Sequence, residues 1–227
     1  NETARRLLEG IGVTKVDVVG DTRFDRVLDI RNAAKPLPLA ERFAGCWKVL
    51  VAGSSWPQDE EIIIPYFNKH PNLKLVLAPH VVSEEHLQAI ERQLARPALR
   101  YSKATPKAVA EVDCLIIDCY GLLSSIYRYA SMAYVGGGFG VGIHNVPEAA
   151  VYGIPVIIGP NNKKFREAQA LLRCGGCKEI AGVADFEQIM DAWLSDKEAL
   201  ATAGKAAGCY IADNAGAADR IFSKTLQ

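Results

Sequence analysis

The residues best suited to chemistry lie in a glycine-rich segment past the middle of the chain. Glycine permits positive φ and lets a ligand approach the backbone closely. The residues that follow stand where a helix would begin, and a helix start offers unpaired N–H groups and a partial positive charge to an anion. The segment therefore predicts the floor of a site for a phosphate-bearing ligand. In order, these residues are Gly136, Gly137, Gly138, Gly140, Gly142, His144, Asn145, Val146, Pro147 and Glu148.

The elements around this segment are expected to form a strand, loop, helix and strand unit. The apolar run Met132–Val135 precedes the glycines as a strand. An Ala-rich helix that starts at Asn145 is expected to end near Gly153, and Ile154–Ile158 is expected as the next strand.

Apolar strands and helices alternate in the same way along most of the chain. Near-continuous apolar strands between helices are typical of a parallel sheet that is covered on both faces. The predicted fold is therefore α/β, a Rossmann-like parallel sheet. Its expected strands are Lys48–Ala52, Asn72–Leu77, a short strand near Tyr101, Asp113–Ile117, Met132–Val135, Ile154–Ile158 and Lys178–Ala181. The main helices are expected at Pro57–Lys69, Ser83–Ala95, Gly121–Ala130, Asn145–Gly153, Lys163–Leu172, Asp185–Leu194, Asp196–Ile211 and Ala215–Lys224.

Ligands of such sheets bind beyond the carboxyl ends of the strands. Loops from distant parts of the chain are therefore expected to meet at one rim and to form the site together. These loops are Gly53–Trp56, Pro79–His80, Asp118–Gly121, Gly136–Glu148 and Gly159–Lys164.

Composition excludes several classes of protein. The 227 residues include 26 Lys and Arg and 26 Asp and Glu, so the formal net charge is zero, which argues against broad nucleic-acid binding. No apolar run approaches the roughly 20 residues of a membrane-spanning helix. The six cysteines have no disulfide-framework spacing and are expected as reduced thiols. Cys174 and Cys177 have CxxC spacing, but neither a second pair nor a histidine cluster accompanies them, so no metal site is expected.

The first 44 residues differ in pattern from the rest. Glu2–Glu9 resembles the end of a helix, Val16–Val19 a short strand, and Arg31–Phe43 a connector that contains Pro36 and Pro38. We expect residues 1–44 to be a strand and connector from a preceding domain, packed on the Rossmann-like domain at residues 45–227. The absence of an initiating Met suggests a piece of a longer protein.

A set of short motifs along the chain closely resembles the 3-deoxy-D-manno-octulosonic acid (Kdo) transferases of lipopolysaccharide synthesis. The resemblance covers essentially the whole chain, and its glycine and helix-start motif is much narrower than a generic nucleotide loop. The motifs are Gly53-Ser54-Ser55, Ala78-Pro79-His80, Asp118-x-Tyr120-Gly121-Leu122-Leu123-x-x-Ile126-Tyr127, Val135-Gly-Gly-Gly-Phe139, Gly142-Ile143-His144-Asn145-x-x-Glu148, and Gly159-Pro160-x-x-x-x-Phe165-x-Glu167-Ala168.

The resemblance implies a GT-B glycosyltransferase, of which this chain is the C-terminal half that binds the nucleotide sugar. It implies transfer of Kdo from CMP-Kdo to a lipid A precursor, with inversion and without NAD or another cofactor. The acceptor site, the membrane-facing patch and the general base would belong to the N-terminal half. The resemblance places the full-length protein at the cytoplasmic face of the bacterial inner membrane, whereas this fragment would be soluble and inactive alone.

Three segments correspond to family residues that contact the nucleotide. Pro79 and His80 match a Pro-Arg loop on the cytidine side, with histidine in place of arginine. The segment Tyr120-Gly121-Leu122 matches a Met-Gly-Glu segment, with leucine in place of the carboxylate, so backbone contacts would remain. The segment from Asn145 to Glu148 matches an Asn-Pro-Leu-Glu helix start and keeps both polar ends.

Physical chemistry assigns roles that agree with this resemblance. Asn145 and Glu148 are three residues apart and would share a helix face. An ionised Glu148 can accept hydrogen bonds from both ribose hydroxyls, while the N–H groups of the helix start receive the CMP phosphate. Ser54 and Ser55 are expected as hydroxyl donors from the opposite loop. Lys163 and its neighbour Lys164 are expected to neutralise the phosphate or carboxylate of the donor.

Simpler roles stay open for the same residues. Glu148 would also complement a helix dipole, Asn145 would also cap a helix, and the serines and lysines would also suit a turn and a solvated surface. Gly137 and Gly138 would also serve close packing of a strand against a helix.

Three other functions also remain as alternatives. The first is a GT-B module for a different donor, such as a UDP-sugar, which would differ from a CMP-Kdo-binding module in how it recognises the base. A dinucleotide-dependent oxidoreductase is disfavoured because Gly138 and Gly140 would need a third glycine where Ile143 stands. A non-enzymatic interaction domain would associate through the face that meets the other half.

Overall fold

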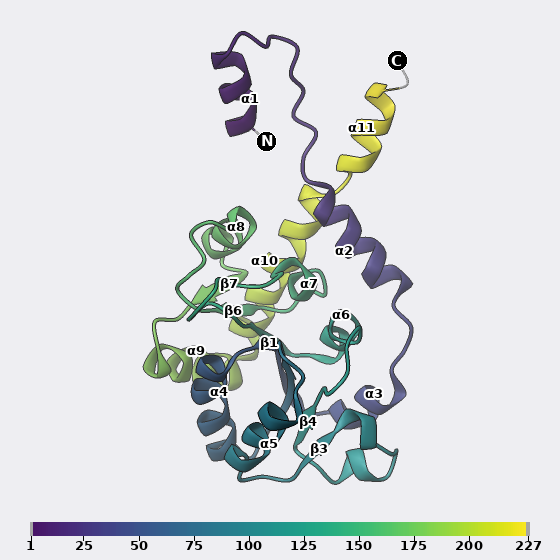
Figure 1. The fold of residues 1–227 in the computed structure, drawn as a ribbon, viewed down its shortest axis with the longest axis vertical. Helices are drawn as coiled ribbons and strands as arrows, with labels where there is room; N and C mark the ends of the chain where they lie inside the picture. The colour runs from purple at the N-terminus through teal and green to yellow at the C-terminus, as the bar shows by residue number, and fades with distance from the viewer. Residues whose placement is uncertain (1, 226–227) are drawn as a thin grey trace.

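The computed structural model describes residues 2–225, and its centre is one seven-stranded parallel sheet (Figure 1). The outer ends of the two expected domains, residue 1 and residues 226–227, lie outside the described residues. The strands run in the order β3-β4-β2-β1-β5-β6-β7, and every neighbouring pair is parallel. They are β1 Lys48–Ser55, β2 Leu73–Pro79, β3 Ala98–Arg100, β4 Cys114–Ile116, β5 Met132–Val135, β6 Val156–Ile158 and β7 Cys177–Glu179.

The apolar sequences of the central strands explain their position. All seven residues of β2 are buried, and so are all four of β5. β1 lies between them, with Leu50 opposite Leu75 of β2 and Met132 of β5. A strand with both faces buried gains from an apolar side chain at every position, so its sequence shows no alternation. The predicted Rossmann-like fold is confirmed.

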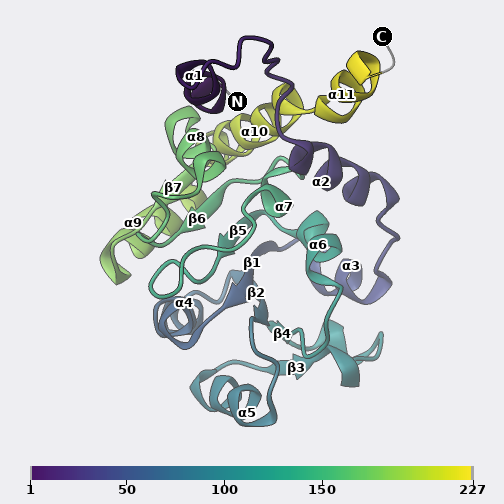
Figure 2. The ribbon, with the colours of Figure 1, turned by 45° about the horizontal axis from the view of Figure 1, so that its top comes forward.

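Helices cover both faces of the sheet, as Figures 1 and 2 show. α4, α5 and α9 lie on one side, and α2, α3 and α6 lie on the other. The helices are α1 Glu2–Gly10, α2 Thr22–Ala33, α3 Pro38–Ala44, α4 Pro57–Lys69, α5 Glu84–Gln93, α6 Leu123–Ile126, α7 Pro147–Ala150, α8 Arg166–Cys174, α9 Val183–Ser195, α10 Lys197–Asn214 and α11 Ala217–Thr225. Short 3-10 turns are η1 Tyr101–Lys103, η2 Ala108–Ala110 and η3 Tyr127–Tyr129.

The N-terminal segment departs from the sequence-based expectation. Val16–Val19, which was expected as a strand, is in no strand, and Val19 accepts a hydrogen bond from Arg220 of α11 through its carbonyl (2.8 Å). The expected connector Arg31–Phe43 instead contains the end of α2 and all of α3 except its last residue, Ala44. Val16–Val19 pairs with neither edge strand of the sheet, β3 or β7.

Local chemistry explains why α2 forms and packs on the sheet. The Asp21 side chain accepts from the Arg23 backbone N–H (2.9 Å), which caps the helix. Phe24 and Val27 are buried in the core cluster that includes strand residues. Within the first 44 residues, α2 and α3 therefore contribute buried side chains, whereas α1 has none.

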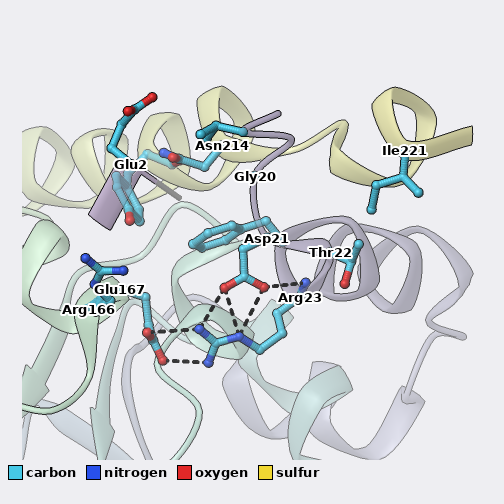
Figure 3. A pocket seen from close by; sticks show the side chains of 12 residues that line it. Glu2, Gly20, Asp21, Thr22, Arg23, Arg166, Glu167, Asn214 and Ile221 are labelled. Atoms are coloured by element: carbon cyan, nitrogen blue, oxygen red, sulfur yellow. Dashed lines mark hydrogen bonds and ion pairs between the residues drawn. The ribbon is translucent and has the colours of Figure 1, made fainter. Parts of the chain in front are cut away.

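A charged cluster joins α2 to α8, at the side of a cavity of about 570 Å3 (Figure 3). The Arg23 guanidinium donates to both oxygens of Glu167, at 3.0 and 3.2 Å, and to Asp21 at 2.8 Å. The Glu167 side chain is only 8% exposed, whereas that of Arg23 is 59% exposed. The guanidinium therefore neutralises a carboxylate that is almost fully removed from water.

We expect Arg23→Met to lower the free energy of unfolding by about 1–2 kcal/mol, because Glu167 then lacks its ionic partner. The value is discounted for the solvent around Arg23. Chemical denaturation of both proteins measures the difference. Arg5→Met is the matched control, because it removes an exposed ion pair with Glu9 within α1. Equal effects of the two substitutions would contradict the prediction.

Three further features bear on the expectations from composition: membrane-spanning helices, metal-ligating clusters and the cysteines. Among residues 2–225, no helix combines the length and apolar character needed to cross a bilayer, and no cluster of metal-ligating side chains is found. All six cysteines are unpaired, and burial raises the pKa of the Cys119 thiol, with Asp118 raising it further.

Candidate functional site

Five of the predicted site residues line one cavity of about 200 Å3 at the carboxyl ends of β1, β2 and β4. They come from three loops that are far apart in the sequence, as the parallel topology requires. The remaining lining residues are mainly apolar. The predicted residues are Ser54, Pro79, His80, Tyr120 and Gly121, and the others are Ala78, Val82, Ile117, Cys119 and Leu123.

Ser54 occupies this cavity through an unusual backbone conformation. Its φ is 53°, and it is the single non-glycine residue with positive φ within residues 2–225. The pairing of β1 with β2 shifts register between Gly53 and Ser55, so Ser54 forms a bulge. Bulges are common next to functional sites because they redirect a side chain, and here Ser54 lines the cavity at the end of its strand.

The glycines after β5 allow close contact between backbones. A Cβ on Gly136 would lie 2.3 Å from the Ser54 carbonyl, and one on Gly138 would lie 2.6 Å from Gly159. Gly137 has φ of +90°, a conformation that only glycine adopts without strain. Gly137 and Gly138 therefore allow loop backbones to pack against each other, not a strand against a helix, while contact with a ligand remains a prediction.

A buried carboxylate holds the glycine loop in place. Asp59 of α4 is 0% exposed, and its carboxylate accepts from the Gly137 N–H (2.9 Å) and the Tyr134 hydroxyl (2.6 Å). It also accepts from the Trp56 backbone N–H at the start of α4 (2.9 Å). Burial raises the pKa of Tyr134, and the adjacent Asp59 raises it further. Asp59 thus fixes the start of α4 and the glycine loop relative to each other.

Three rings connect the cavity to the glycine loop. The His80 ring stacks on Trp56, with centroids 4.8 Å apart, and on His144, with centroids 4.3 Å apart. The Trp56 indole Nε1–H donates to Nε2 of His144 at 3.2 Å. Burial lowers the pKa of His144, and the neighbouring His80 ring lowers it further, although Asp59 raises it. His80 therefore lies between the two parts of the site.

Ser55 is placed differently from what its sequence position suggested. Its side chain is 0% exposed, and its hydroxyl donates to Glu60 at 2.8 Å. The other Glu60 oxygen lies 2.8 Å from Nε2 of His86, whose Nδ1 faces the Val81 carbonyl at 2.9 Å. Ser55 therefore supports the loop after β2 through Glu60 and His86. Its hydroxyl is buried and already hydrogen-bonded, so it is not exposed to a ligand.

Asn145 and Glu148 lie together, as expected. The Asn145 amide donates to the Glu148 carboxylate at 2.7 Å, and Glu148 is half-buried beside mainly apolar residues that include Val27 and Val151. Glu148 lines a narrow cleft next to Ser124 of α6, whereas the preceding residue, Leu123, lines the cavity. The two spaces therefore flank α6. Burial raises the pKa of Tyr127, and the Glu148 carboxylate raises it further.

The helix that begins here is shorter than expected. α7 is a single turn, Pro147–Ala150, and turns follow it. Gly153 then lies against α10, where Gly204 approaches its carbonyl. The chain must turn early to enter β6, so packing against α10 overrides helix propensity. Within residues 2–225, the backbone N–H groups of Asn145 and Val146 donate to no acceptor, while Val146 and Pro147 are buried.

Two further predicted residues lie outside the cavity. Leu122 is half-buried and packs against the hydrophobic core instead of facing the cavity. Lys163 is exposed on the turn before α8, as is Lys164, and neither has a hydrogen-bond or ionic partner among the described residues. The larger cavity beside Arg23 contains none of the predicted site residues.

Sequence reasoning missed the residues that position the site. Neither Asp59 nor Glu60 was among the residues predicted for the site, and Trp56 was named only as the last residue of the loop Gly53–Trp56. One local signal was available: Asp59 stands three residues after the helix entry, where a capping-box carboxylate is expected. Nothing local indicates that its carboxylate also reaches Gly137, 78 residues further along the chain.

Several relatives of this chain carry the name 3-deoxy-D-manno-octulosonic acid transferase. The relative from Chlamydophila psittaci is 31% identical over 182 residues, which are 77% of this chain and 41% of the relative. The relative from Rickettsia prowazekii is 29% identical over 166 residues, which are 67% of this chain and 34% of the relative. The chain thus spans less than half the length of these relatives. No protein-family model matches it.

Solved structures show the same fold. The C-terminal CMP-Kdo binding domain of WaaA from Acinetobacter baumannii superposes with a TM-score of 0.64 at 18% identity, covering 83% of this chain and 97% of that domain. HepE from Anabaena, solved in complex with UDP-glucose, has a TM-score of 0.58 at 11% identity and covers 88% of this chain and 54% of its own. By sequence and by fold, the chain is a homologue of the 3-deoxy-D-manno-octulosonic acid transferases, built like the C-terminal domain of a GT-B glycosyltransferase.

Proposed function

We propose that the chain binds CMP-Kdo and serves as the donor-binding half of a glycosyltransferase that transfers Kdo in lipopolysaccharide synthesis. The relatives named Kdo transferase support the reaction, and the fold of a CMP-Kdo binding domain supports the role of this half. The observation that carries the proposal is the continuous rim formed by the cavity, the His80 and His144 rings and the glycine loop.

Each part of the nucleotide has a matching part of this rim. The cavity of about 200 Å3 is assigned to the base, which would lie beside His80 and Tyr120. The Glu148 carboxylate, held by Asn145, is assigned to the ribose hydroxyls, because an ionised carboxylate accepts several hydrogen bonds. The N–H groups of Asn145 and Val146, which donate to no acceptor within residues 2–225, are assigned to the phosphate, which then lies next to the glycine loop.

These assignments explain how the site would assist transfer. The bond between the sugar and the phosphate oxygen breaks, so negative charge grows on the departing CMP phosphate. N–H donors that are already fixed in place stabilise this charge, by about 3 kcal/mol for a good donor. The donors are fixed because Asp59 holds the neighbouring glycine loop from below. A single turn such as α7 adds little helix dipole, so the individual N–H groups carry this role.

The remaining steps are assigned to the part of such enzymes that this chain does not span. The matched region is 41% of the Chlamydophila psittaci relative, and the proposed function places the lipid A precursor site, the general base and any contact with a membrane surface outside it. No cofactor is needed for the proposed transfer. The proposal therefore predicts donor binding, and not turnover, for the 227-residue chain alone.

Isothermal titration of the chain with CMP, UMP and cytidine tests the proposal. We expect CMP to bind at micromolar to millimolar concentration, more tightly than cytidine because of the phosphate and more tightly than UMP because of the base. Equal affinity for CMP and UMP would instead favour a module for another donor, such as a UDP-sugar. Failure of CMP to bind at millimolar concentration would refute the proposal.

A further inference from the structure

The stack of Trp56, His80 and His144 contains two imidazole rings, and it lies beside the position that the proposed function assigns to the phosphate. Their centroids are 4.3 Å apart and their planes are inclined by 27°, so the rings face each other. Histidine is the side chain whose charge changes between about pH 5 and pH 8. The protonation states of these two rings therefore decide the charge at the centre of the site.

Hydrogen bonding keeps His144 neutral. The Trp56 indole nitrogen can only donate, so Nε2 of His144, 3.2 Å away, must be the unprotonated acceptor. A neutral ring then carries its hydrogen on Nδ1. The Cδ2 edge of the same ring lies against Gly137, which turns Nδ1 to the opposite side. Protonation of His144 would require loss of the Trp56 hydrogen bond, and burial opposes it as well.

His80 has the opposite surroundings. Its ring is exposed, and neither ring nitrogen has a hydrogen-bond partner within residues 2–225. Its ring stacks on Trp56, with centroids 4.8 Å apart, and the face of an indole attracts a cation. Two charged rings at 4.3 Å would repel each other, so a single proton is expected on the pair.

His80 is also the one side chain of the cavity lining that can become a cation. The other lining residues include two weak acids, Cys119 and Tyr120, and no lysine or arginine. The Asp59 carboxylate acts electrostatically on His144 of this stack, and it already accepts hydrogen bonds from Trp56, Tyr134 and Gly137. An anion at the junction of cavity and glycine loop therefore finds its counter-charge on His80.

We propose that binding of a nucleotide phosphate at this site takes up a proton, which is carried by His80 while His144 remains neutral. This inference rests on the proposed function. It implies that the affinity for the donor depends on pH. Because the anion favours the protonated ring, binding is strongest at acidic pH and weakens as pH rises and the ring loses its proton. Lysine and arginine contacts would not produce this dependence, since they keep their charge over this range.

The test is isothermal titration of the 227-residue chain with the methyl ester of CMP. CMP itself is unsuitable for proton counting because its phosphate titrates near pH 6, whereas the methyl ester keeps one negative charge. Titrations in buffers of different ionisation enthalpy give the protons taken up. We expect about half a proton or more per ligand near pH 7.5, and an affinity that falls about tenfold between pH 6 and pH 8. Cytidine, which lacks the phosphate, should take up none.

Two variants assign the proton. His80→Gln should abolish the proton uptake and leave a weaker, pH-independent affinity. His144→Gln should retain it, because the glutamine oxygen can still accept from Trp56. With four histidines in the chain, their imidazole NMR signals report directly which ring titrates and whether each variant is folded.

The outcomes separate this inference from the proposed function. Binding of the methyl ester without proton uptake, or uptake that survives His80→Gln, would overturn the inference and leave donor binding intact. Proton uptake that is lost in His144→Gln but retained in His80→Gln would place the proton on His144 and would also overturn the inference. Absence of binding by both CMP and its methyl ester would overturn the two proposals together.

Discussion

Replacement of Glu148 by alanine is expected to weaken CMP binding by about a hundredfold or more. The proposed site gives this carboxylate two hydrogen bonds to the ribose hydroxyls, and a hydrogen bond to a charged group contributes about 1.5–3 kcal/mol. Glu148→Gln keeps one oxygen acceptor without the charge, so its loss should be intermediate, at about tenfold. Titration calorimetry with CMP measures both variants.

The fold is expected to survive the same substitutions. Glu148 is half-buried, and within residues 2–225 its side chain is hydrogen-bonded only to Asn145, at 2.7 Å, so the free energy of unfolding should change by less than about 1 kcal/mol. Glu111→Ala is the control for binding, because Glu111 is exposed at the end of η2, which packs against α3. An unchanged CMP affinity in a folded Glu148→Ala protein would contradict the ribose role.

Replacement of Asp59 by asparagine is expected to lower the free energy of unfolding by about 3 kcal/mol or more and to weaken CMP binding in the protein that remains folded. The Asp59 carboxylate is fully buried and accepts from Gly137, Tyr134 and the Trp56 backbone. An amide has only one oxygen acceptor, so its NH2 group would face one of these donors, and a buried donor would lose its partner.

Two matched substitutions separate this effect from a general weakening of α4. Glu61→Ala changes an exposed acid in the same helix, and we expect a change within about 0.5 kcal/mol. Tyr134→Phe removes one of the three hydrogen bonds and should have an intermediate effect. Denaturant unfolding followed by tryptophan fluorescence measures stability, and heteronuclear NMR of Gly137 and Gly138 reports the position of the loop. An Asp59→Asn protein as stable as the Glu61→Ala protein would refute the positioning role.

Sequence alone determined the layered architecture and the location of the glycine loop. Strand positions are encoded locally, because a strand buried on both faces must be apolar throughout, as in Leu73–Pro79. The five loops at one rim follow from the same information, since parallel strands place their carboxyl ends at one edge of the sheet. The N-terminal helices were harder to predict because α2 is stabilised by burial of Phe24 and Val27 rather than by a clear helical pattern.

Which polar groups lie under that rim was decided only by the tertiary structure. Asp59 and Glu60 occupy consecutive positions in a first helical turn, yet one holds the glycine loop and the other holds the loop after β2. Ser54 and Ser55 are neighbours as well, and a single bulge sends one to the cavity and the other into the interior. Such differences depend on the direction of each side chain in the packed sheet, which residue type and spacing do not specify.

The stack of the Trp56, His80 and His144 rings shows most clearly what the sequence determines and what the tertiary structure adds. The sequence places Trp56, His80 and His144 in three separate loops, and the hydrogen bond between Trp56 and His144 spans 88 residues. Local patterns encode the elements that these loops connect. The contact between the rings exists because parallel pairing of β2 and β5 with β1 brings those loops to one edge. The sequence thus determined the elements and their loops, whereas the protonation state of the site depends on distances that only the packed sheet sets.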